Sequence, residues 1–206
     1  LALVLLVIVG VTRHQKNKAV SADSPVTLSE VDENRPELDV ELLTVNPYSR
    51  PGTALEKVNG IVIHYTANPG ATAIANRNYF ENLKDTHTTK ASSHFVVGLE
   101  GEIVQCIPTA EIAYASNDRN SDTISIECCY KNKDGSFEQA TYDSVIKLTA
   151  WLCAKFGLTS EDVIRHYDVT GKLCPLYYVE HEDAWAQFKK DVDTYLQVYK
   201  TGDENG

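Results

Sequence analysis

The sequence predicts a single α/β domain, in which a central mixed β-sheet is flanked by helices. Short runs of β-branched residues alternate with longer segments whose apolar residues recur at helical spacing, which is the order typical of a sheet covered by helices. Two of the short runs are separated only by Glu100 and Gly101, which predicts a hairpin and therefore an antiparallel pair within the sheet. The length of 206 residues fits one domain with flanking segments.

Five strands are predicted, at residues 61–65, 95–99, 102–107, 123–130 and 163–165. The first follows an Asn-Gly turn and reads IVIHY, a β-branched run typical of a buried strand. The second and third form the hairpin. In the fourth, Ile124 and Ile126 lie on the face opposite to Glu127, because successive side chains of a strand point to opposite sides.

Three main helices are predicted, at residues 71–83, from Thr141 to Gly157 and at residues 182–199, with a shorter one near residues 26–32. Thr141 is the expected N-cap of the second helix, and Gly157 ends it. The last helix carries an apolar stripe at helical spacing: Trp185, Phe188, Val192, Leu196 and Tyr199. Such a stripe indicates a core face rather than a ligand-binding face.

The two ends of the chain differ in composition from this domain. Residues 1–11 (LALVLLVIVGV) are apolar but shorter than the ~20 residues of a membrane-spanning helix. We interpret them as the remnant of a signal peptide or, preferably, of a membrane anchor, whose orientation the basic residues that follow leave open. We expect residues 12–45 to form a flexible linker, residues 46–200 the folded domain and residues 201–206 a disordered tail. Residues 1 to about 46 should then be dispensable for catalysis.

The net charge excludes nucleic acid as a partner. The chain has 19 Lys and Arg against 29 Asp and Glu, a formal net charge of −10, whereas binding to a phosphate backbone needs clustered basic residues. With 43% hydrophobic and 23% charged residues the composition is globular. A domain of this size folds without a metal, so metal ligands would indicate chemistry rather than structural support.

Three residues have the types and positions of an open metal site. His64 and His166 each lie at the end of a predicted strand, and Cys174 follows His166 in a loop that contains Gly171. Two imidazoles and one thiolate form a tetrahedral zinc site with one position left for water or substrate. A structural zinc finger is excluded, because the chain has no paired Cys-x-x-Cys motifs.

Four segments that contain these residues match a known family. They read IVIHYTANPGATA, SSHFVVGLEGEIVQCIP, DTISIECC and VIRHYDVTGKLCP, in this order along the chain. Together they resemble the zinc-dependent N-acetylmuramoyl-L-alanine amidases of the amidase-2 type, which include endolysin domains and peptidoglycan recognition proteins. The resemblance extends from about Tyr48 to Trp185 and implies the fold of that family.

The resemblance also implies roles for single residues. It assigns the zinc ligands to His64, His166 and Cys174. Glu127 occupies the position of the catalytic acid, and Lys172 that of a lysine over the substrate carbonyl. Tyr65, Thr66 and Tyr114 are expected to contact substrate. The chemistry is coherent, since zinc polarises an amide carbonyl, a carboxylate moves the proton, and an ammonium stabilises the oxyanion.

The implied activity is zinc-dependent hydrolysis of the amide bond between N-acetylmuramic acid (MurNAc) and L-alanine in bacterial cell-wall peptidoglycan. The partner would be the muropeptide stem with its MurNAc, and we expect a monomer at the extracellular face, membrane-anchored or secreted, in association with the cell wall. The main alternative is a non-catalytic peptidoglycan-binding module on the same fold. Relatives of that kind typically lack the cysteine ligand, so Cys174 favours the enzyme. A zinc peptidase of different bond preference, or an amidase restricted to small muropeptides, stays open.

Two positions depart from the family pattern. Ser93 stands where some relatives carry a catalytic tyrosine, so we assign the proton transfer to Glu127. Ala113 and Tyr114 stand where many relatives have a Trp-His pair. His94 is expected to pack behind the site as a structural residue.

The cysteines other than Cys174 are Cys106, Cys128, Cys129 and Cys153. They allow three fully paired connectivities, or they are free thiols buried as small apolar side chains. Cys128 and Cys129 point to opposite faces of a strand and are not expected to pair with each other.

Overall fold

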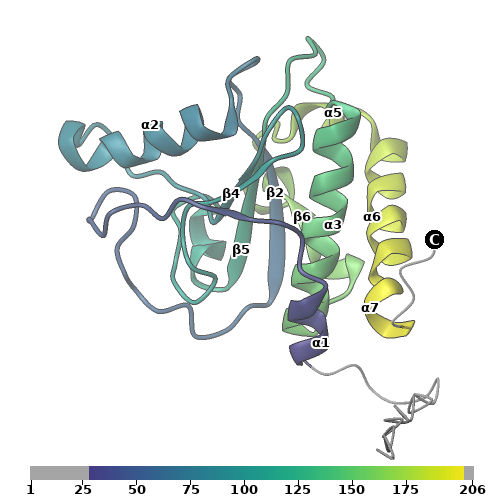
Figure 1. Cartoon of the computed structure of the whole chain (residues 1–206). Coiled ribbons are helices and arrows are strands. Elements are labelled where there is room, and N and C mark those ends of the chain that lie inside the picture. The colour runs from purple at the N-terminus through teal and green to yellow at the C-terminus, as the bar shows by residue number, and fades with distance from the viewer. Residues whose placement is uncertain (1–27, 202–206) are drawn as a thin grey trace, which may run out of the picture.

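The computed structural model describes residues 28–201. Six strands form one mixed sheet in the order β1-β4-β3-β5-β2-β6 (Figure 1). Their bounds are β1 (Asp39–Val40), β2 (Gly60–Tyr65), β3 (Phe95–Val97), β4 (Ile103–Gln105), β5 (Thr123–Cys128) and β6 (Val163–Arg165). Neighbours among β3, β5, β2 and β6 are parallel, whereas β3 and β4 form an antiparallel hairpin and β1 pairs with β4 in parallel. The predicted mixed sheet is confirmed.

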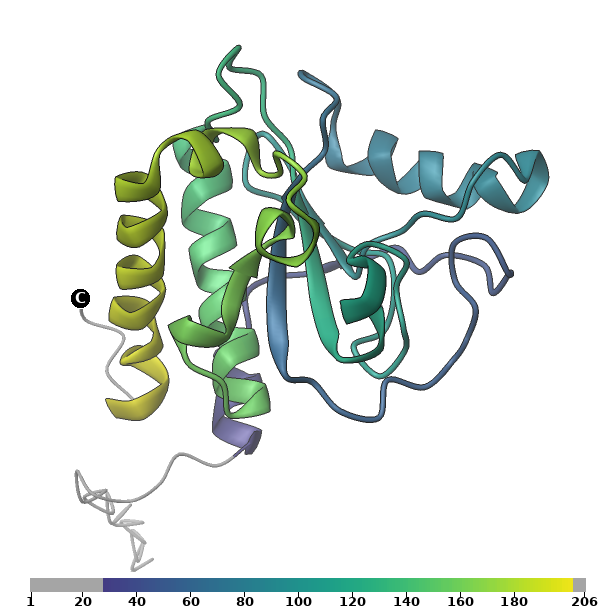
Figure 2. The same ribbon diagram turned by 180° about the vertical axis from the view of Figure 1, so that it is seen from behind.

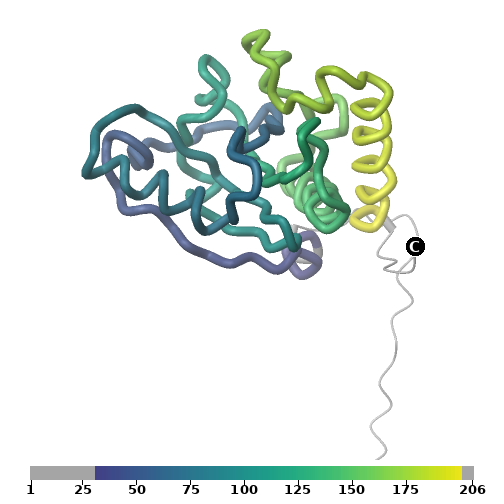
Figure 3. Tube along the Cα trace, turned by 90° about the horizontal axis from the view of Figure 1, so that it is seen from above, coloured from purple at the N-terminus to yellow at the C-terminus, as the bar shows by residue number. Residues whose placement is uncertain are grey.

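The helices lie on both sides of this sheet. They are α1 (Leu28–Glu33), α2 (Ala73–Thr86), α3 (Gln139–Phe156), α4 (His166–Thr170), α5 (Leu176–Glu180), α6 (Glu182–Leu196) and α7 (Val198–Thr201), with 3₁₀ turns at Asn117–Ser121 and Ser160–Asp162. Figure 2 shows α3 and α6 side by side, and Figure 3 shows α2 on the opposite side of the molecule from α6.

Each face of the sheet buries its own apolar cluster. The cluster beneath α3 and α6 contains Ile124 and Ile126 of β5 together with the stripe of the last helices. The cluster beneath α2 contains Leu43, Phe80, Val96 and Cys129 among others. The alternation predicted for β5 is therefore confirmed, and Glu127 lies on the α2 face, away from the larger apolar core.

Two predicted helix details are wrong. Thr141 is not an N-cap, because α3 begins at Gln139 and Thr141 is buried inside it, where its hydroxyl donates to the carbonyl of Gly98 at 2.8 Å. A tertiary hydrogen bond to the hairpin thus takes the place of a local cap. The last helix is also not continuous, since α6 ends at Leu196 and α7 begins at Val198. Gly157 does end α3, with a left-handed φ of 67°.

The predicted domain start at residue 46 is wrong as well. Val31 and Leu43 are 5% and 1% exposed, and β1 extends the sheet beside β4. Side chains of the domain also hold this segment, since Lys155 donates to Asp32 at 2.7 Å and Arg77 to the carbonyl of Leu42 at 2.8 Å. Residues 28–45 are therefore part of the folded unit rather than a linker.

The apolar segment at residues 1–11, the rest of the expected linker up to residue 27, and the tail from residue 202 lie outside the described residues. Within residues 28–201, none of the helices has the length and apolar character needed to span a bilayer. All five cysteines are buried free thiols.

Candidate metal and catalytic site

Parallel strands bring the predicted site residues to one edge of the sheet. His64 in β2 and Glu127 in β5 are register partners on neighbouring parallel strands, so their side chains share the α2 face. His166 is the first residue of α4, directly after β6, which pairs with the other side of β2. Ligands in open α/β sheets collect at the carboxyl ends of the strands, and this site obeys that rule.

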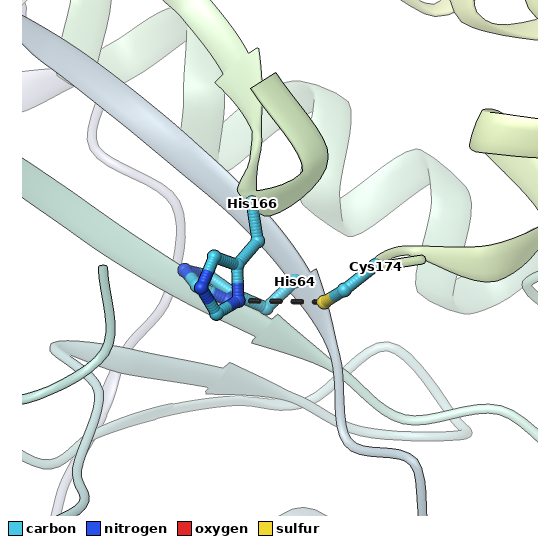
Figure 4. Close-up of side chains that lie close together, drawn as sticks. All are labelled: His64, His166 and Cys174. Atoms are coloured by element: carbon cyan, nitrogen blue, oxygen red, sulfur yellow. Dashed lines mark hydrogen bonds between the residues drawn. The ribbon is translucent and has the colours of Figure 1, made fainter. Parts of the chain in front are cut away.

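The three predicted metal ligands converge. Their ligand atoms all lie within 4.8 Å of one another. The Cys174 sulfur is 3.9 Å from His64 Nδ1, and the two imidazole rings have centroids 4.7 Å apart (Figure 4). His64, His166 and Cys174 are 1%, 7% and 2% exposed. A buried set of two imidazoles and one thiol, with no fourth His, Cys, Asp or Glu in the group among the described residues, fits an open zinc site.

The surroundings of His64 and His166 favour the neutral form of both imidazoles. Burial, the neighbouring His166 and the Lys172 ammonium hold the pKa of His64 well below its usual value. Burial and Lys172 likewise lower the pKa of His166. Both rings are therefore unprotonated at neutral pH, which is the form that binds a metal. The backbone N–H of Tyr65 bonds to the Cys174 sulfur and opposes the rise in the thiol pKa to about 12 that burial causes.

A buried guanidinium holds the segment that carries two of the three ligands. Arg165 precedes His166 and forms a bidentate pair with Asp168, with distances of 3.1 and 2.8 Å. Its third nitrogen donates to the carbonyl of Tyr178 at 2.7 Å and to Glu182 at 2.8 Å. Arg165 thus ties α4, α5 and α6 together beneath the site, and such a fork is beyond the reach of a lysine.

Glu127 and Lys172 both line the cavity beside the triad. One carboxylate oxygen of Glu127, Oε2, is buried without a hydrogen-bond partner among residues 28–201. Burial raises the pKa of Glu127 to about 8, against the opposing effect of the Lys172 ammonium. Lys172 is exposed, in the loop between α4 and Cys174. A carboxyl group that gains and loses a proton near neutral pH, within reach of a metal site, is suited to acid–base chemistry.

The cavity has a volume of about 370 Å³ and opens to solvent. Its walls are formed by the triad with Glu127 and Lys172, by Tyr65, Phe80, Lys90, Ala91, Ser92 and Tyr114, and by Ala115, Asn117 and Asn120. Lys90 lies 5.5 Å from the centre of the Tyr114 ring, in a cation–π arrangement.

The Amidase_2 family, described as N-acetylmuramoyl-L-alanine amidase, matches residues 54–176, which is more than half of the chain and includes every residue of the triad. The chain belongs to this amidase family.

Curated relatives and solved structures agree with this assignment. The N-acetylmuramoyl-L-alanine amidase CwlL of Bacillus licheniformis is 39% identical over 165 residues, which are 74% of this chain and 45% of that protein. BlyA of Bacillus subtilis (strain 168), also named an N-acetylmuramoyl-L-alanine amidase, is 37% identical over 171 residues, again 45% of that protein. The chain therefore spans less than half the length of these relatives.

Among solved structures, the catalytic domain of XlyA superposes with a TM-score of 0.64 at 30% identity and covers 76% of this chain and 99% of that chain. PlyL superposes with a TM-score of 0.66, covering 78% of this chain and 99% of that chain. Its 24% identity supports the fold alone.

Of the three expected substrate contacts, Tyr65 and Tyr114 line the cavity and Thr66 does not. The ring of Tyr65 stacks on Tyr130 with centroids 5.1 Å apart and packs against the core beneath α3, while its backbone N–H bonds to Cys174. The Thr66 hydroxyl is buried without a partner among the described residues, and Thr66 is not one of the cavity-lining residues.

His94 and Ser93 are buried polar residues that do not line the cavity. His94 Nε2 donates to the carbonyl of Glu111 at 2.8 Å, and its Nδ1 accepts the backbone N–H of Ser125 at 3.0 Å. Ser93 donates to the carbonyl of Ser125 at 2.9 Å. These hydrogen bonds connect the segment that precedes β3 to β5, which supports the structural role expected for His94.

Sequence reasoning missed Lys90, Ser116 and Asn117 at this site. Lys90 lies in a polar loop, and its neighbours in the sequence carry no signal of a binding residue. Ser116 and Asn117 belong to the segment SNDRNSD, whose composition indicates a turn before β5. This composition does not place the turn near the site, because the turn precedes β5 whereas the site lies at the carboxyl ends of the strands.

Proposed function

We propose that this chain hydrolyses the amide bond between the lactyl group of MurNAc and L-alanine in peptidoglycan, as a zinc-dependent amidase. The observation that carries the proposal is the buried His64, His166 and Cys174 set beside the unpartnered carboxylate oxygen of Glu127. The named activity of the relatives supports the choice of bond.

The zinc ion would be held by the Cys174 sulfur, by His64 through Nδ1, which faces that sulfur at 3.9 Å, and by His166. When bound, Zn²⁺ supplies Lewis-acid polarisation of the amide carbonyl and lowers the pKa of a coordinated water toward ~7.

Glu127 moves the proton. Its free Oε2 accepts the proton of the attacking water as the water oxygen bonds to the carbonyl carbon. The protonated carboxyl then returns this proton to the amide nitrogen as the C–N bond breaks. The products are the lactyl carboxylate of MurNAc and the free amino group of L-alanine. A pKa raised to about 8 lets Glu127 hold the proton between these two steps.

Lys172 stabilises the charge that develops on the carbonyl oxygen. Its ammonium is close enough to both histidines and to Glu127 to shift their pKa values. A cation fixed beside a developing oxyanion is worth more in the transition state than in the ground state.

The wall formed by Lys90 and Tyr114 is our proposed contact for the stem peptide, together with the strand end at Tyr65 and Thr66. The lactyl carboxyl is consumed in the scissile amide, so free carboxylates of the substrate belong to the stem rather than to the glycan. An ammonium on this wall is complementary to such a group. Lys90→Met should raise KM about threefold to tenfold on acidic stems, with kcat unchanged. An unchanged KM on these stems would remove Lys90 from the binding wall.

The substrate sets the location, since peptidoglycan lies outside the cytoplasmic membrane. We propose that the chain acts there on the cell wall, as a monomer. The anchor or signal remnant predicted at residues 1–11 would deliver it to that side.

The test is digestion of purified peptidoglycan followed by mass spectrometry of the soluble products. We expect stem peptides with a free L-alanine amino group and glycan strands with intact lactyl groups. The products should disappear with a chelator and return with added Zn²⁺. A non-catalytic module would bind the wall and release nothing, and a peptidase would release fragments cut inside the stem.

A further inference from the structure

One turn of the chain contacts both histidines of the triad. Ser116 Oγ lies 3.1 Å from His64 Nε2, and Asn117 Oδ1 lies 3.0 Å from His166 Nε2. The two contacting residues are consecutive, at the start of the 3₁₀ turn that leads into β5. The turn therefore contacts two ligands that come from different elements, β2 and α4.

A second set of hydrogen bonds holds the turn in place. Asn120 Oδ1 accepts the backbone N–H groups of Ala115 at 3.0 Å and Ser116 at 2.6 Å. Asn117 has a φ of +53°, in the left-handed region where asparagine is one of the few tolerated side chains. Ser116 is buried. The side chains of Ser116 and Asn117 are thus presented to the histidines by a defined backbone rather than by a free loop.

We propose that Ser116 and Asn117 are positioning residues for the metal ligands, with Asn120 as their support. An amide oxygen can only accept, so the contact with Asn117 requires the proton of His166 on Nε2. The Ser116 hydroxyl accepts the corresponding proton of His64. Each ring is thereby fixed in the tautomer whose Nδ1 is free, and for His64 this nitrogen is the one facing Cys174. The inference rests on the zinc site of the proposed function.

Ser116 and Asn117 are uncharged, and this affects the electrostatics of the site. Carboxylates often orient metal-bound histidines, but here a hydroxyl and an amide do so. Among the described residues that line the cavity, Glu127 is the single carboxylate. No second carboxylate on the wall competes with Glu127 for the Lys172 ammonium or for the proton in transit.

The test measures metal binding without substrate. The dissociation constant of Zn²⁺ is determined by competition with a chelating dye, and the coordination geometry is followed through the ligand-field spectrum of bound Co²⁺. Ser116→Ala removes one hydroxyl, and Asn117→Gly removes the amide while keeping the left-handed backbone accessible. Each should weaken zinc binding about 10- to 100-fold and alter the Co²⁺ spectrum.

Two further variants separate positioning from a general loss of structure. Asn117→Asp keeps an acceptor and tolerates the left-handed backbone, so it should restore zinc binding to the parent value or better. Ser121→Ala changes an exposed hydroxyl of the same turn and should leave zinc binding and the Co²⁺ spectrum as in the parent. The metal-free variants should share the unfolding midpoint of the parent.

Parent-like zinc binding in the Ser116→Ala, Asn117→Gly double variant would overturn the proposal. So would a loss of zinc binding in Asn117→Asp equal to that in Asn117→Gly, because the acceptor would then be irrelevant. Failure of the proposed hydrolysis is seen separately, as absence of products from a zinc-loaded parent. Failure of the zinc site itself is seen as a parent that binds no Zn²⁺.

Discussion

His94 and His64 are buried on the same face of the sheet, on either side of the strand that carries Glu127, yet their ring nitrogens are used differently. Both nitrogens of His94 are paired with backbone groups of Glu111 and Ser125. His64 has one nitrogen on Ser116, while the other faces the sulfur of Cys174. A buried imidazole with both nitrogens paired supports the fold. One with a free nitrogen aimed at other donors is available to a metal.

The same contrast separates Glu127 from Glu111. Glu111 is paired with Arg50 at 2.7 Å, and this pair lowers its pKa. Glu127 keeps an oxygen unpaired although it is buried, and its pKa is raised. The pairing of Glu111 stabilises the fold, whereas the unpaired buried oxygen of Glu127 is costly for stability and useful for the proton transfer we propose.

The largest effect is expected for Glu127→Gln. Glutamine is nearly isosteric but cannot accept the proton of water, so turnover of muropeptides should fall about 10²- to 10⁴-fold. Zinc content and the unfolding midpoint should stay close to those of the parent. Activity within a few-fold of the parent would show that Glu127 does not transfer the proton.

The second effect concerns the N-terminal segment, which contributes a buried side chain to each of the two apolar clusters. A chain that begins at Thr44 lacks Val31 and Leu43, which are buried in the two clusters. Burial of two such side chains contributes roughly 3–6 kcal/mol to the free energy of unfolding. We expect this loss in urea denaturation, relative to a control chain that begins at Leu28. Equal urea midpoints for the two chains would support the predicted domain start at residue 46.

A smaller effect is expected for His94→Ala. The substitution leaves the carbonyl of Glu111 and the N–H of Ser125 without their side-chain partner, and each buried group costs about 1–3 kcal/mol. The stability of the metal-free protein should fall accordingly, while the number of zinc ions bound per chain stays the same. Loss of zinc without loss of stability would show that His94 is a metal ligand rather than a structural residue.

The pH dependence of stability gives the finest distinction. Burial lowers the pKa of His94 to about 4, against the smaller raising effect of Glu111. As the pH falls below about 6.5, His94 becomes protonated in the unfolded chain but stays neutral in the folded chain. This residue therefore adds stability above that pH. The contribution is lost at about 1.4 kcal/mol per pH unit as the pH falls from 6.5 toward 4.

The difference between the parent and His94→Asn, both metal-free, isolates this residue from other titrating groups. The parent should lose more stability than the variant over that pH range. Identical slopes would mean that His94 is protonated in the folded state.

Much of the site followed from the sequence because it depends on strand ends. His64 and His166 were predicted from their positions at strand ends, Cys174 from its place in the loop that follows, and all three also from the family resemblance. The role of Glu127 came from that resemblance, and the alternation of β5 is consistent with it. Residue type and local period suffice for such features, since a parallel sheet collects strand ends at one edge.

The features that sequence reasoning missed depend on contacts between distant segments. β1 has two residues in a polar stretch, so its pairing with β4 has no local signal. Thr141 fits an N-cap locally, but its hydroxyl bonds to the hairpin instead. Ser116 and Asn117 have the composition of any turn, and their importance comes from the two histidines that the fold places beside them.

The most direct measurement is zinc stoichiometry in a matched set of histidine variants. Parent, His64→Ala, His166→Ala and His94→Ala are purified alike, and zinc per folded chain is measured by elemental analysis. We predict one zinc ion in the parent and in His94→Ala, and loss of zinc in His64→Ala and His166→Ala. Retention of zinc by His64→Ala, or its loss from a folded His94→Ala, would contradict the distinction between a histidine with a nitrogen available to a metal and one with both nitrogens paired.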